Sequence, residues 1–252
     1  MTLPQLGLQL YTVRHADVPL DDLLREVAAA GYAGVEAVGT QGVAPEALRA
    51  ALAQSGLALA SAHVPLADLR RDREAVVATH LALGTPMLVV PWLAPEDRPT
   101  DLRGWATLGS ELDALGDRLV DAGLQLAYHH HDFELVRYGD RDGLTALLDA
   151  AAPEHLSVEL DSGWLLAVGN DPVAWLAHWA SRVARLHLKD LIPGGTPPWV
   201  DVGDGVLDVG AVLRAASEQG VAWALVEHDA PDDPLATARR SAGAALAALR
   251  GL

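Results

Sequence analysis

The stretch DLRGWATLGSELDALGDRLVDAGLQLAYHHH, residues 101–131, contains one complete helix–strand unit of this chain. Its first part has apolar residues at intervals of three and four, which predicts an amphipathic helix that ends at Gly123. The apolar run Leu124–His131 then predicts a buried strand that finishes in three histidines. Because alternate side chains of a strand share a face, we expect His129 and His131 on one face and the middle histidine on the other.

The same unit recurs along the whole chain. Eight short apolar runs, each bounded by glycine, proline or a charge, predict strands over Leu6–Tyr11, Gly34–Val38, Leu57–Val64, Met87–Pro91, Leu124–His131, Leu156–Asp161, Val183–Lys189 and Ala222–His228. Helical spacing predicts helices over Asp21–Gly31, Pro45–Gly56, Arg73–Gly84, Asp101–Gly123, Gly143–Ala151, Pro172–Ser181, Val209–Gly220 and Pro234–Leu249.

These units predict the fold class. Strands that are apolar throughout and rich in valine and leucine are typical of a parallel sheet covered on both faces. Eight strand–helix units in 252 residues predict an α/β protein with one domain, a (β/α)8 TIM barrel over residues 1–252. An open doubly wound sheet is the alternative, but no glycine-rich phosphate-binding turn follows the first strand. The longest loops are Pro91–Thr100 and Leu191–Gly205, and the glycines of the second suit a mobile cover over a site.

Composition excludes several classes of protein. Without cysteine, the chain has no disulfide and no thiolate ligand or nucleophile. A formal net charge of −16 disfavours a general nucleic-acid binder, because such a surface repels phosphate backbones. We find no apolar run long enough for a membrane span and no signal-peptide pattern, so we expect a cytoplasmic protein. Oligomeric state is open, since Trp175, Trp179 and Trp199 suit either a homo-oligomer contact or internal packing.

Polar and titratable residues gather at the carboxyl end of nearly every predicted strand, which is where active sites of TIM barrels lie. They are Gln9 and Tyr11, Glu36, His63, His129 and His131, Glu159 and Asp161, His187 and Lys189, and Glu227 and Asp229.

Four of these residues come from four consecutive strands and could close on one ion: His129, Asp161, His187 and Glu227. Two imidazoles and two carboxylates suit divalent Mn, Co, Zn or Fe, whereas pure oxygen ligation would suit Mg or Ca better. The expected cofactor is therefore a divalent metal, with Mn, Co, Zn and Mg as candidates. Other interpretations stay open. Asp161 could cap the segment that follows it, and Glu227 could form a buried ion pair with Lys189.

Several motifs resemble those of the sugar phosphate isomerase/epimerase proteins of the xylose-isomerase-like barrel superfamily. They are LGLQLYTVR at residues 6–14, GYAGVEAVG at 31–39, SAHVPL at 61–66, VVPWL at 89–93, YHHHDFEL at 128–135, ELDSGWLLAVGNDP at 159–172, RLHLKD at 185–190, GDGVLD at 203–208 and LVEHD at 225–229. The resemblance implies a divalent metal at the strand ends and a polyol or keto-sugar bound to it. It also implies that Asp161, His187 and Glu227 are metal ligands.

Two departures from the family pattern bear on the reaction. Many relatives carry Glu and Asn where this chain has His129 and His130. In the epimerase branch that Glu and the one on strand eight are the paired proton-transfer bases, so this chain lacks one of them. His131 matches a base of keto-sugar-cleaving relatives, and Glu134 is a second residue that could approach the ion or substrate.

From these features we expect a metal-dependent isomerase or epimerase that removes a proton next to a metal-bound carbonyl of a keto-sugar or inosose, through an enediolate. The proton would go to His131 or Glu227, and Lys189 would stabilise the oxyanion. The expected substrate-binding residues are His63, Glu36, Trp92 and Glu134. Because the loop Leu191–Gly205 has no Arg or Lys, we favour an unphosphorylated substrate.

Three other functions remain open. The enediolate could instead expel a leaving group, as in an inosose dehydratase or a keto-glycoside-cleaving lyase. A non-catalytic sugar-binding barrel would fit the two departures from the family pattern. An endonuclease IV-like DNA repair enzyme would share the barrel, but it needs more metal ligands and a basic face for DNA.

Overall fold

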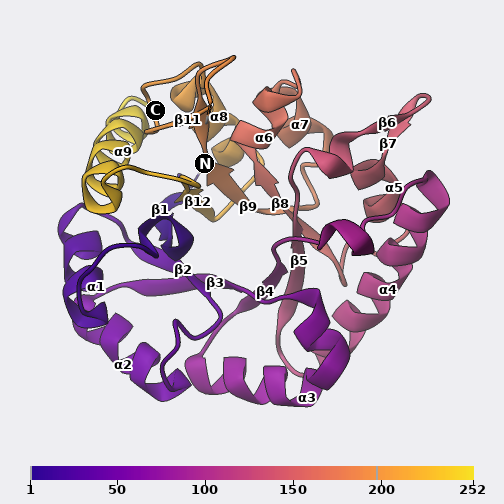
Figure 1. Ribbon diagram of the computed structural model, residues 1–252, viewed down its shortest axis with the longest axis horizontal. Helices are drawn as coiled ribbons and strands as arrows, with labels where there is room; N and C mark the ends of the chain where they lie inside the picture. Colours follow the sequence, from indigo (N-terminus) through magenta and orange to yellow (C-terminus); the bar gives the residue numbers. More distant parts are fainter. Residues whose placement is uncertain (1, 197) are drawn as a thin grey trace.

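Eight parallel strands close into a barrel, and helices form a ring around it (Figure 1). The computed structural model describes residues 2–196 and 198–252. The barrel strands, in spatial order, are β1 (Gln5–Gln9), β2 (Gly34–Val38), β3 (Ala58–His63), β4 (Met87–Val90), β5 (Gln125–His129), β8 (Ser157–Asp161), β9 (Val183–Leu188) and β12 (Trp223–Val226). Pairing of β1 with β12 closes the ring, which confirms the predicted (β/α)8 barrel.

The helices follow the chain around the barrel, so that α9 returns to lie beside α1 (Figure 1). They are α1 (Leu20–Ala29), α2 (Pro45–Ser55), α3 (Leu66–Leu83), α4 (Leu102–Asp121), α5 (Gly143–Asp149), α6 (Ser162–Ala167), α7 (Pro172–His178), α8 (Val209–Glu218) and α9 (Pro234–Arg250). In the described part of the chain, no helix combines the length and apolar character that a membrane span requires.

The helix in the quoted stretch forms as its sequence predicts. The carboxylate of Asp101 accepts a hydrogen bond of 2.7 Å from the backbone N–H of Gly104, which caps the start of α4. Trp105 and Leu112 on its apolar stripe are fully buried. Burying one such side chain contributes about 1.5–3 kcal/mol to the unfolding free energy.

Helix α3 begins earlier than its sequence pattern predicts. It starts at Leu66 rather than Arg73, and Asp72 interrupts it with a non-helical backbone (φ −156°, ψ 76°). The Asp72 carboxylate accepts a hydrogen bond from the N–H of Ala75, so Asp72 acts as the N-cap of a second helical segment. The helical spacing of apolar residues predicted the second segment, from Arg73 onward, but not the helical residues between Leu66 and Asp72.

The loop Leu191–Gly205 has more structure than a mobile cover would need. Strands β10 (Asp190–Leu191) and β11 (Trp199–Val200) pair antiparallel, while Pro197 lies outside the described residues. Asp190 accepts hydrogen bonds from the backbone N–H groups of Gly203, Gly205 and Leu207. The second half of this loop is therefore held against the end of β9.

Smaller elements lie near the barrel rim. Strands β6 (Arg137–Tyr138) and β7 (Arg141–Asp142) form a small hairpin after β5. Short 3-10 helices cover Leu10–Val13, Pro95–Asp97 and Phe133–Leu135. The first of these ends strand β1 at Gln9, two residues before its predicted end, because the Gln9 side chain accepts a hydrogen bond from the N–H of Tyr11.

Candidate active site

The interior of the barrel is polar at its carboxyl end, and its side chains form two layers. Strand register sets the layers, because Glu159 pairs with His129 and Asp161 pairs with His187. A register shift between Val158 and Glu159 accompanies this arrangement. Four side chains around the upper layer, which we call the rim group, could together hold one cation: Asp161, His187 and Glu227, with His129 reaching them from beside the deeper Glu159.

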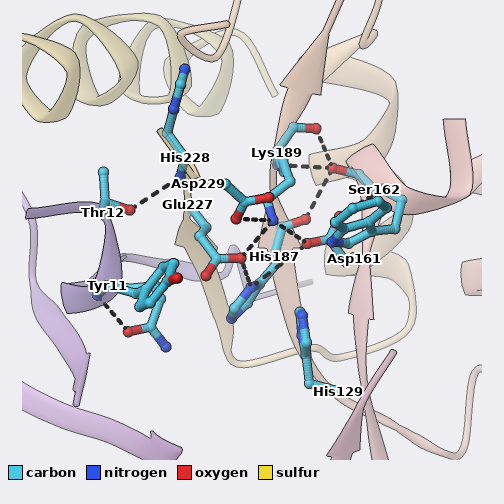
Figure 2. Close-up of polar contacts among 12 residues, drawn as sticks. Tyr11, Thr12, His129, Asp161, Ser162, His187, Lys189, Glu227, His228 and Asp229 are labelled. Carbon is cyan, nitrogen blue, oxygen red and sulfur yellow. Dashed lines mark hydrogen bonds and ion pairs between the residues drawn. The ribbon is translucent and has the colours of Figure 1, made fainter. Parts of the chain in front are cut away.

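The rim group is the set that the sequence predicts for a metal. One potential ligand atom from each residue lies within 4.8 Å of all the others, and all four residues are buried. Nδ1 of His187 lies 3.0 Å from Oε2 of Glu227 and 3.8 Å from Oδ2 of Asp161 (Figure 2). The structure thus brings together the predicted ligands from β5, β8, β9 and the end of β12.

The sequence leaves open whether Asp161 caps the next helix or binds a metal, and its two carboxylate oxygens can do one each. Its Oδ1 accepts a hydrogen bond from the N–H of Trp164, so the residue does cap α6. Its Oδ2 is buried without a hydrogen-bond partner among the described residues. Buried polar atoms are nearly always satisfied, so an orphaned carboxylate oxygen in the rim group fits a cation there.

Lys189 is the only lysine in the sequence, and it is fully buried beside the rim group. Its Nζ lies 2.8 Å from Oδ1 of Asp229, 2.9 Å from Oε2 of Glu227 and 3.6 Å from Oδ2 of Asp161 (Figure 2). Burial alone would lower the pKa of Lys189, but these carboxylates raise it well above its ordinary value. Lys189 is therefore a fixed ammonium that can donate hydrogen bonds but cannot serve as a base.

The two candidate bases are both unprotonated, for different reasons. Burial opposes ionisation of Glu227, but Lys189 and His187 more than offset it and hold the pKa of Glu227 below its ordinary value. Burial and the charge of Lys189 lower the pKa of His131 to about 2, so its imidazole is neutral. Nδ1 of His131 is buried, with no hydrogen-bond partner in the described part of the chain. Both residues are thus able to accept a proton.

His130 and Glu134 support the strand end rather than line the cavity. Nδ1 of His130 donates to the carbonyl oxygen of His131, and its Nε2 accepts from the N–H of Asp161. Glu134 accepts hydrogen bonds from the hydroxyl of Tyr128 at 2.7 Å and from the N–H of His131 at 2.8 Å. Burial raises the pKa of Glu134 to about 7. The middle histidine therefore points away from the other two, as strand alternation predicts, and orients Asp161.

A cavity of about 640 Å³ opens above the rim group. Its walls are Tyr11, Val38, His63, Pro65, Pro91, Trp92, Arg98, His129, His131, Asp132, Phe133, Trp164, Glu227 and Asp229. Among the predicted substrate-binding residues, His63 and Trp92 line this cavity, whereas Glu36 and Glu134 are buried outside its walls.

Sequence reasoning found Trp92 but missed Trp164 and Phe133 among the aromatic walls of the cavity. Trp164 packs against Trp199 and His131 at ring-centroid distances of 4.6 and 5.2 Å. Arg98 lies over the ring of Phe133 at 3.7 Å. Trp164 follows directly on Asp161-Ser162-Gly163, so its nearness to a predicted ligand was the available signal.

Comparison with known proteins agrees with the barrel fold. The xylose isomerase-like TIM barrel family model matches residues 24–251. This chain belongs to that family.

Two relatives resemble this member of the xylose isomerase-like family over most of its length. Rhizopine catabolism protein MocC of Rhizobium meliloti is 29% identical over 267 residues, which cover 92% of this chain and 78% of MocC. Inosose dehydratase of Lacticaseibacillus casei is 26% identical over 270 residues, covering 92% of this chain and 86% of that enzyme.

A solved structure shares the fold of this family member. The crystal structure of a sugar phosphate isomerase/epimerase from Parabacteroides distasonis superimposes with a TM-score of 0.81 and 21% sequence identity. The match covers 98% of this chain and 96% of the other. At that identity the likeness shows the barrel fold alone.

Proposed function

We propose that this chain is a metal-dependent enzyme that removes a proton from the carbon next to the carbonyl of a keto-sugar or inosose. One observation carries the proposal: four ligand-type side chains converge beside a cavity that His131, an unprotonated base, also lines. The relatives support the substrate class, because they include inosose dehydratases.

The rim group would hold the cation through His129, Asp161, His187 and Glu227. When bound, a divalent cation supplies Lewis-acid stabilisation of negative charge on substrate oxygen. The mixed nitrogen and oxygen donors favour Mn, Co, Zn or Fe over Mg. The charge of Lys189 lies at the same place and would add electrostatic stabilisation as negative charge develops.

His131 is the residue we assign as the proton acceptor. It lines the cavity, it is neutral, and its Nδ1 has no partner within the described residues. Glu227 also lines the cavity, but it contacts both Lys189 and His187 and is one of the four residues that would hold the cation, so it is less available as a base. The backbone N–H of His131 donates a hydrogen bond to the carboxylate of Glu134, which fixes the backbone that carries this imidazole.

Two candidate reactions share the enediolate that proton removal produces, and they differ in what happens to it next. Return of the proton to the same or the neighbouring carbon gives epimerisation or isomerisation. Loss of a hydroxyl gives dehydration, and the likeness to inosose dehydratase over 92% of this chain favours that second candidate. With His129 on β5, a simple two-carboxylate epimerisation lacks one of its bases.

A substrate screen with and without metal tests the proposal. Metal-stripped protein is incubated with inososes and unphosphorylated keto-sugars in deuterated water, with Mn²⁺ or Co²⁺ added or withheld. We expect metal-dependent deuterium incorporation next to the carbonyl for at least one compound, and isomer or dehydrated product from the same compound. Binding without exchange or turnover for every compound would favour a sugar-binding barrel and contradict the proposal.

A further inference from the structure

A second cluster of ligand-type side chains lies one layer deeper in the barrel than the rim group. It comprises His63, His129, Glu159 and His187, and we call it the deep cluster. One potential ligand atom of each residue lies within 4.8 Å of the others, and each residue is buried. His129 and His187 belong to both sets, whereas His63 and Glu159 belong only to the deep cluster.

Three imidazole nitrogens converge on one carboxylate oxygen in the deep cluster. Oε2 of Glu159 lies 2.9 Å from Nε2 of His63, 3.0 Å from Nε2 of His187 and 3.2 Å from Nδ1 of His129. A neighbouring carboxylate, Glu36, lies 3.1 Å from the same nitrogen of His63 and 2.8 Å from that of His187. Gln9 donates a hydrogen bond of 2.6 Å to Glu36 and orients it.

Protons alone cannot satisfy this arrangement. Each ring nitrogen carries at most one proton, so three nitrogens supply at most three hydrogen bonds to five close nitrogen–oxygen contacts. Oε1 of Glu159, Oε1 of Glu36 and Nδ1 of His129 are buried, and no described residue hydrogen-bonds to them. Unsatisfied buried atoms are costly, and a cation among them would remove that cost.

His187 can serve both layers as a bridging imidazolate, because its two nitrogens face opposite ways and its ring N–H proton passes to solvent when the second cation binds. Its Nδ1 faces Glu227 in the rim group, and its Nε2 faces Glu159 in the deep cluster. A cation binds imidazoles in their unprotonated form, and in that form the carboxylates here exceed the Lys and Arg by three charges. One dication in the rim group would therefore leave the site with a net charge of −1. The groups counted are Glu36, Glu159, Asp161, Glu227 and Asp229 against Arg185 and Lys189.

We propose that His63, His129, Glu159 and His187 form a second, structural cation site that takes Zn²⁺ or a similar nitrogen-preferring dication. Three imidazoles and one carboxylate suit the four-coordinate geometry of zinc, and they do not suit Mg²⁺ or Ca²⁺. The bound ion ties β3, β5, β8 and β9 together inside the barrel. This site does not depend on the reaction proposed above.

Metal content of variants tests the site. His63→Ala and the near-isosteric Glu159→Gln alter only the deep cluster, whereas Asp161→Asn and Glu227→Gln alter only the rim group. Ser61→Ala is the matched control, since it removes a buried hydroxyl from the same strand without touching a ligand. Full-length proteins are loaded with Zn²⁺, freed of excess metal and measured by elemental analysis, with circular dichroism to confirm folding.

We expect two zinc ions per chain in the wild type and in Ser61→Ala, and one in His63→Ala and in Glu159→Gln. Cobalt substitution adds a second readout, because a tetrahedral site gives strong visible absorption that both deep-cluster variants should lose. Three results would overturn the deep site. The first is one zinc ion per chain that only the rim-group variants lose. The other two are one zinc ion that the variants of both groups lose, and no bound zinc in the wild type. A single zinc that only the deep variants lose would support the deep site and instead contradict the rim ligands.

Discussion

Replacing Lys189 with Met should destabilise the metal-free protein strongly and make bound metal more stabilising. The ammonium contacts Asp229 and Glu227 and lies 3.6 Å from Asp161. Removing one partner from a buried charge group costs about 3–5 kcal/mol, because uncompensated charge stays in the interior. Methionine keeps an unbranched stem against Gly163, whose backbone leaves no room for a Cβ beside Lys189. The loss would therefore come mainly from charge.

The assay is urea unfolding of metal-stripped protein, repeated with Mn²⁺ or Zn²⁺ in excess. In the wild type the ammonium repels a cation in the rim group, so Lys189→Met should raise metal affinity about tenfold or more. Added metal should then recover most of the lost unfolding free energy. Arg25→Met is the matched control, since its pair with Asp22 is exposed and should contribute less than about 1 kcal/mol. A Lys189→Met protein as stable as wild type without metal, or stabilised by metal no more than wild type, would refute this reasoning.

Other variants separate the roles of the remaining residues. Asp161→Ala or His187→Ala should remove the rim cation while the fold survives; metal content that stays at the wild-type level in both would show that the ligands are misassigned. His131→Ala should keep the metal but slow solvent deuterium exchange into a keto-sugar substrate, and unchanged exchange would exclude it as the base. The pKa of Glu134 rises from 4.5 to about 7 on folding, so the native state holds an extra proton between these values. Its contribution is therefore present at low pH and is lost as pH rises through this window. Glu134→Gln should reduce the fall in unfolding free energy between pH 5 and 7 by about 2–3 kcal/mol, and an unchanged slope would contradict the burial argument.

The sequence was sufficient to predict the barrel because each unit follows simple local rules. In residues 101–131 the helical stripe, the stop at Gly123 and the apolar strand all form as their spacing predicts. Alternation correctly placed His130 opposite its two neighbours. The early start of α3 was missed because Asp72 caps an internal break, which looks in sequence like the beginning of a new helix.

The sequence predicted that the four rim residues lie close together, but it did not predict the depth at which the other polar residues lie. Sequence alternation places Glu159 and Asp161 on the same inward face, but it does not say that they lie in different layers. Depth depends on register between strands, and β-bulges change that register between Val35 and Glu36 and between Val158 and Glu159. Glu36, expected in the sugar pocket, consequently lies against the histidines below it.

Long side chains were equally hard to place from sequence. The sequence allowed Lys189 to pair with Glu227. The structure pairs it with both Glu227 and Asp229, and Asp190 holds the loop that follows. Trp179 and Trp199, which suited either a subunit contact or internal packing, are both buried within the chain.

Anomalous diffraction from a crystal soaked in Mn²⁺ would test the rim group most directly. We predict a peak of anomalous density within bonding distance of His129, Asp161, His187 and Glu227. Crystals that diffract well and show these four side chains ordered, but with no such peak between them at saturating Mn²⁺, would contradict the assignment of a metal to this barrel rim.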